Sequence, residues 1–158
     1  MANTQSMATS FMGELMTATH NFGASPTRAG ATADTFKAAL YLTSATVNAA
    51  TTAYSSSNEV TGTNYVAGGV TVTNATAPIA TNSSATAGVA YWTPSASITY
   101  TNVTLSTAFD AVLIYNSTQS NKAVSVHTFG SQTITAGTFT LTMPTNNTST
   151  GLLRLATT

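Results

Sequence analysis

Short runs in which apolar residues alternate with threonine recur along most of the chain, and they constrain its fold more than any other feature. In residues 138–143, Phe139, Leu141 and Met143 hold one phase and three threonines hold the other. A period of two places one set of side chains on each face of a β-strand. Turn residues separate the runs about every 8–12 residues. This pattern predicts an all-β fold, an antiparallel β-sandwich or jelly roll of about eight strands.

Some of these strands carry further signals. Gly68 and Gly69 can both take positive φ, so they predict a tight hairpin between residues 65–67 and 70–72. The apolar phase changes near Asn102, which predicts a bulge or bend there. The other strands are expected at residues 35–42, 89–93, 98–105, 109–115, 122–129, 132–135, 138–143 and 152–156.

The strand at residues 35–42 is expected to alternate between two faces. Lys37 and Tyr41 fall on the opposite side from its apolar phase, which holds Phe36, Ala38, Leu40 and Leu42. Two polar stretches, residues 43–63 and 74–88, contain few strand formers and are expected to be long loops.

The N-terminal residues follow a different period. Apolar residues recur at helical spacing, with Ser10 or Thr9 as a cap and Asn21 with Gly23 as an end, so a short amphipathic helix is expected over residues 7–20. This helix could close one end of its own β-core, or it could dock on a partner. The candidate docking residues are Phe11, Met12, Leu15 and Met16. We therefore expect a helix and linker arm over residues 1–33 and a β-sandwich domain over residues 34–158.

Charged residues are scarce. The chain has four Lys or Arg and four Asp or Glu, which is 5% of its residues, whereas soluble domains carry about a quarter. Threonine accounts for roughly a fifth of the chain. An uncharged surface has little self-repulsion to keep monomers apart. Such a composition is typical of a part that packs against neighbours, and it indicates a structural component rather than an enzyme.

The chain lacks the residues that several classes of function require. The chain has no cysteine, no calcium-loop motif and no paired carboxylates, so we expect no metal site and no cofactor. Its scattered basic residues form no patch for nucleic acid. No apolar run is long enough for a membrane span, and the first residues lack the pattern of a signal peptide. Asn-x-Ser/Thr is the acceptor motif for N-glycosylation, but in a chain this rich in Thr and Ser such tripeptides are expected by chance, so we predict no glycosylation sites.

Two constellations could still carry chemistry. Ser125, His127 and Asp110 can be written as a triad, but no nucleophile-turn motif accompanies them, so we expect no catalytic residues. Tyr91 and Trp92 could stack on a sugar, although a single Trp in a sandwich more often fills the core, with its N–H bonded internally. His20 is expected to cap the end of the helix.

The order of motifs resembles that of small virion structural proteins of tailed bacteriophages. The opening at residues 11–22 and 34–41 carries the resemblance first. The later landmarks are the stretches at residues 63–69, 111–116, 127–141 and 151–155. These motifs are turn glycines and core positions, so they identify a lineage better than a biochemical role.

The resemblance implies a non-enzymatic capsid cement or decoration protein. Its partners would be the major capsid protein and further copies of itself, as a dimer or trimer. Its location would be the outer surface of the phage head, after synthesis in the host cytoplasm. Two alternatives remain: a tail, neck or head-fibre component, and a carbohydrate-binding or adhesin domain that uses Tyr91 and Trp92.

Overall fold

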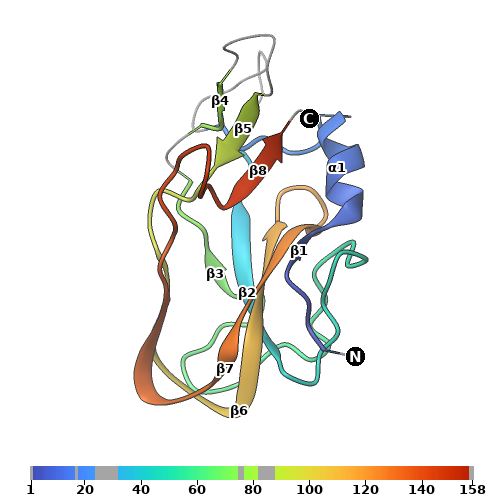
Figure 1. The fold of residues 1–158 in the computed structure, drawn as a ribbon. Helices are drawn as coiled ribbons and strands as arrows, with labels where there is room; N and C mark the ends of the chain where they lie inside the picture. Colours follow the sequence, from blue (N-terminus) through green and yellow to red (C-terminus); the bar gives the residue numbers. More distant parts are fainter. Residues whose placement is uncertain (1, 17, 24–31, 75–76, 82–87, 157–158) are drawn as a thin grey trace.

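The computed structural model describes residues 2–16, 18–23, 32–74, 77–81 and 88–156 (Figure 1). These residues are mostly β-structure in two antiparallel sheets, which confirms the predicted all-β class of about eight strands. The elements are β1 (Ser6–Met7), α1 (Thr9–Met16), β2 (Phe36–Leu42), β3 (Val70–Thr71), β4 (Ile79–Thr81), β5 (Val89–Trp92), β6 (Ile98–Asn116), β7 (Lys122–Leu141) and β8 (Leu153–Ala156). The larger sheet has the order β1-β7-β6-β2-β3, and the smaller has the order β4-β5-β8.

Two long strands dominate the larger sheet. β6 and β7 pair along their length and bend together at the lower end of the view in Figure 1. We predicted five shorter strands here, and this division was wrong. The chain absorbs extra residues as bulges within the ladder rather than ending it. One bulge is at the predicted position, where Asn102 has a φ of 51° and the register shifts between Tyr100 and Val103.

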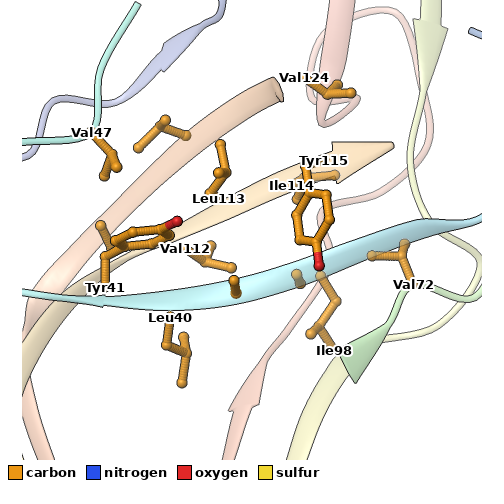
Figure 2. Packing of buried hydrophobic residues seen from close by; sticks show 14 of the residues in the cluster. Leu40, Tyr41, Val47, Val72, Ile98, Val112, Leu113, Ile114, Tyr115 and Val124 are labelled. Carbon is orange, nitrogen blue, oxygen red and sulfur yellow. The ribbon is translucent and has the colours of Figure 1, made fainter. Parts of the chain in front are cut away.

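β2 lies inside the larger sheet, between β6 and β3, and both of its faces are covered. Leu40 and Tyr41 point to opposite sides of the strand and are both buried (Figure 2). Tyr41 thus lies on the face opposite Leu40, as the alternation predicts, and both faces are buried. Its hydroxyl donates a hydrogen bond to the carbonyl of Ser55, which allows the polar end of the ring to be buried.

The hairpin predicted around Gly68 and Gly69 does not form. Both glycines adopt positive φ, 87° and 72°, in a turn. However, β3 pairs with β2, at Ala38 opposite Val70, and residues 65–67 join no strand. The buried carboxylate of Glu59 explains the difference. It accepts hydrogen bonds from the hydroxyl of Tyr65 (2.7 Å) and the amide of Gly68 (2.8 Å), so it holds the first arm of the turn away from the ladder.

The two predicted loops differ in outcome. Residues 43–63 join the sheet through isolated bridges only, as expected of a long loop. Residues 74–88 are not entirely a loop, because β4 pairs with β5 through Ile79 opposite Tyr91. Within this stretch, residues 75–76 and 82–87 lie outside the described part.

The helix is shorter than predicted. Residues 6 and 7 pair with β7 instead of starting the helix, so α1 begins at Thr9. It ends at Met16, and Ala18 takes a positive φ of 54° while the amide of Thr19 bonds the carbonyl of Glu14. This is the geometry by which helices terminate. The predicted boundary between residues 33 and 34 adjoins the segment 24–31, which lies outside the described residues, and it stays a prediction.

Candidate functional site

An apolar groove lies where helix α1 meets the smaller sheet, and in Figure 1 the helix lies beside β8. The groove encloses a cavity of about 90 Å³ and presents no polar surface. The residues that line the groove are Met7, Phe11, Leu15, Phe22, Pro78, Ala90, Tyr91, Trp92, Leu153 and Leu155.

The period of each element explains why these side chains meet. Leu153 and Leu155 are two residues apart on β8, so they share one face of the smaller sheet. Phe11 and Leu15 are one helical turn apart on α1, so they form a stripe along the helix. Alternation in the strand and one turn of the helix therefore supply the two walls of the groove.

The four residues predicted as a docking face do not all have the same exposure. Phe11 is buried and Leu15 is partly buried, whereas Met12 is 50% exposed and Met16 is 89% exposed. Across the groove, Leu155 is 42% exposed. The inner stripe of the helix packs on the protein's own core, whereas Met12 and Met16 face solvent, and docking of a partner through this helix stays a prediction.

An aromatic cluster underlies the groove and joins the two sheets. Phe22 stacks on Phe36 with 4.3 Å between ring centroids, and it contacts Trp92 edge-on at 4.8 Å. Phe36 belongs to the larger sheet and Trp92 to the smaller one. The indole Nε1 of Trp92 donates to the side-chain oxygen of Asn74 at 2.9 Å. The expectation that Trp92 fills the core with its N–H bonded internally is confirmed, and Trp92 offers no surface for stacking on a sugar.

A chain of polar contacts fastens helix α1 to the larger sheet. The carboxylate of Glu14 contacts Lys122 Nζ at 2.6 Å and His20 Nε2 at 2.7 Å. The other ring nitrogen of His20 accepts from Asn116, whose amide also donates to Asp34. Burial alone would raise the pKa of Glu14, but the hydrogen bonds and charges of Lys122 and His20 lower it, and the net shift is downward. Glu14 therefore stays ionised as the helix anchor.

His20 was expected to cap the helix end with its ring. It is instead buried and bonded on both nitrogens, so that prediction was wrong. Long-range pairing explains the difference, because Asn116 lies at the end of β6 and reaches His20 only in the folded chain. The sequence offered one signal for this site: charged and histidine residues are so rare that each one is expected to have a specific partner.

The triad considered from the sequence is only partly assembled. Ser125 Oγ and His127 Nε2 lie 2.9 Å apart. Asp110 is engaged elsewhere, since its carboxylate accepts a hydrogen bond from Asn3 at 2.6 Å, and no hydrogen bond joins it to His127. The acid that would orient the imidazole of a catalytic triad is therefore missing from this pair.

The burial of His127 predicts that the stability of the folded protein depends on pH. Burial lowers its pKa to about 4. Because the unfolded chain takes up a proton near pH 6.5 and the folded chain does not, the stabilisation is full above that pH and is lost as the pH falls toward 4. We expect urea midpoints of the wild type to fall between pH 7 and pH 4.5, and those of His127→Gln to fall less. Equal slopes for the two proteins would contradict this role.

In the described ranges, no group of three or more His, Cys, Asp or Glu side chains is placed to hold a metal ion. No helix in the described part of the chain is long and apolar enough to cross a membrane.

In comparisons with known proteins, the chain matches no family model, no curated protein and no solved structure.

Proposed function

We propose that the chain is a non-enzymatic cement protein that binds the outside of an assembled tailed-bacteriophage head shell. The observation that carries the proposal is the apolar groove. Its lining contains no charged side chain, Leu155 within that lining is 42% exposed, and the chain has only eight Lys, Arg, Asp and Glu residues. Exposed apolar clusters of this kind mark sites of protein association. The resemblance in the order of sequence motifs supports the choice of a phage virion as the setting.

The mechanism would be linkage between binding and assembly. A protein that binds the assembled shell, and not the dissociated subunits, stabilises the shell by mass action. Several weak contacts per oligomer multiply into strong attachment, so each groove needs only modest affinity. An apolar groove suits this role, because its contribution comes from buried area and is not screened by salt. The proposed partners are the major capsid protein and further copies of the chain.

The burial of one residue, Trp92, argues against the alternative of a carbohydrate-binding domain. Trp92, the aromatic side chain that such a domain would present, is only 2% exposed. A tail, neck or head-fibre component differs from cement mainly in number. The number of copies per virion distinguishes the two, and quantitative mass spectrometry of purified virions measures it. A cement protein should be present in hundreds of copies, and a tail, neck or head-fibre component in a dozen or fewer.

A charge placed in the groove tests the docking site. We expect Leu155→Glu to weaken attachment to shells about tenfold or more, because Leu155 lines the groove and a carboxylate there would be buried against apolar surface. Val66→Glu is the matched control, since Val66 is 70% exposed and does not line the groove. Sedimentation of purified shells with each protein measures the bound fraction. Equal binding by the two variants would overturn the groove as the docking site.

A further inference from the structure

The outer half of β7 carries a long backbone edge. β1 covers β7 only at Val126 and Ser125, on the side away from β6. From residue 128 to residue 141, no described backbone group pairs with that outer side, and the inner side pairs with β6. A row of unpaired amides and carbonyls is a template for another strand.

This segment has few of the features that usually prevent an exposed strand edge from pairing with another chain. Natural proteins block open edges with charged side chains, proline, bulges or very short strands. Residues 123–153 contain no Lys, Arg, Asp or Glu, and residues 128–142 contain no proline. Two bulges place extra residues on β7, one between Gly137 and Ile134, where Ala136 has a φ of 46°, and one between Gln132 and Thr128. Beyond these bulges, at residues 139–141, the ladder is regular, with Phe139 opposite Tyr100 and Leu141 opposite Ile98.

The side chains of this regular stretch are incompletely covered. Thr138 and Thr140 are exposed on one face, and Phe139 and Leu141 on the other face are only partly buried. A strand added along the edge would extend both faces at once. It would cover the apolar side chains and continue the threonine face.

We propose that β7 pairs with β7 of a second copy, antiparallel about a two-fold axis at residues 138–141. An antiparallel edge is complementary to itself, because a two-fold axis brings donors of one strand opposite acceptors of the other. Without charged groups on the segment, two copies meet without repulsion. This pairing gives a structural basis to the self-association in the proposed function, but it uses a surface separate from the groove.

Sedimentation of the free protein, without shells, tests the pairing. We expect the wild type to form a dimer and Thr138→Lys/Thr140→Lys to raise the dimer dissociation constant at least about tenfold, because four positive charges would meet at the axis. Added salt should restore part of the association, since it screens that repulsion. A circular dichroism spectrum checks that the variant is folded.

The matched control adds the same charge to the same face of the neighbouring strand, β6. Thr99→Lys/Thr101→Lys should leave the dimer unchanged, because Thr99 lies opposite Thr140 on β6, away from the edge. A monomeric wild type, or an unaffected edge variant, would overturn the proposal. Loss of the dimer in both variants would also overturn it, since that result indicates association through the face. Leu155→Glu should dimerise normally, because Leu155 lies on β8, so failure of shell docking and failure of this pairing are separable.

Discussion

Replacing Gly69 with alanine should destabilise the fold by at least about 3 kcal/mol. A Cβ atom at this position would lie 1.6 Å from the carbonyl oxygen of Ala38 in β2. The obstacle is backbone, which cannot move without breaking the β2–β3 ladder. The positive φ of 72° adds strain for any residue with a Cβ. Urea denaturation of the variant, or its failure to accumulate as folded protein, measures the effect.

Gly13→Ala is the control for this substitution. A Cβ on Gly13 meets nothing within 4 Å, and the residue lies inside helix α1. Alanine there should stabilise the protein by about 0.5–1 kcal/mol, because it restricts the unfolded chain and favours the helix. Similar stabilities for the two variants would contradict the close approach of the turn to β2.

Replacing Trp92 with alanine should cost about 3–5 kcal/mol of stability. The indole packs against Phe22 and Phe36 where the two sheets meet, so its removal leaves a cavity at the junction. Asn74 would also lose its hydrogen-bond donor. Thermal unfolding followed by circular dichroism gives the loss.

Trp92→Phe separates the two contributions at this position. It keeps an aromatic ring against Phe22 and removes the indole N–H, so we expect a smaller loss than for alanine. A loss below about 1 kcal/mol for Trp92→Ala would contradict the core role of the indole. It would also reopen the carbohydrate-binding alternative.

Local signals in the sequence predicted the fold class and several details of the strands. The period-two alternation around Phe139 and Leu141 depends only on neighbouring residues, and it predicted a strand that the structure contains. The phase change near Asn102 predicted the bulge for the same reason. The turn at Gly68 and Gly69 was also predicted, but its pairing was wrong. A local pattern cannot reveal that β3 would pair with β2, or that Glu59 would hold Tyr65 away.

The groove was predicted only on its helical wall. Helical spacing identified Phe11 and Leu15, whereas Leu155 appeared only as part of a closing strand. The two walls meet through tertiary packing, for which the sequence carries no local signal. The contact of Glu14 with Lys122 is of the same kind, since it joins residues 108 positions apart in the sequence. Alternation placed Tyr41 on the face opposite Leu40 but could not predict that both faces are buried, because a strand inside a sheet can be covered on both.

The connection between the two long strands has a consequence for the order of folding. Residues 117–121 alone join β6 to β7, so the largest ladder in the molecule closes through a very short loop. Short loops cost little chain entropy, and local contacts form early. The smaller sheet pairs β5 with β8 across the whole of that hairpin, so its closure must follow. We expect the β6–β7 hairpin to form the folding nucleus and the groove to be completed last.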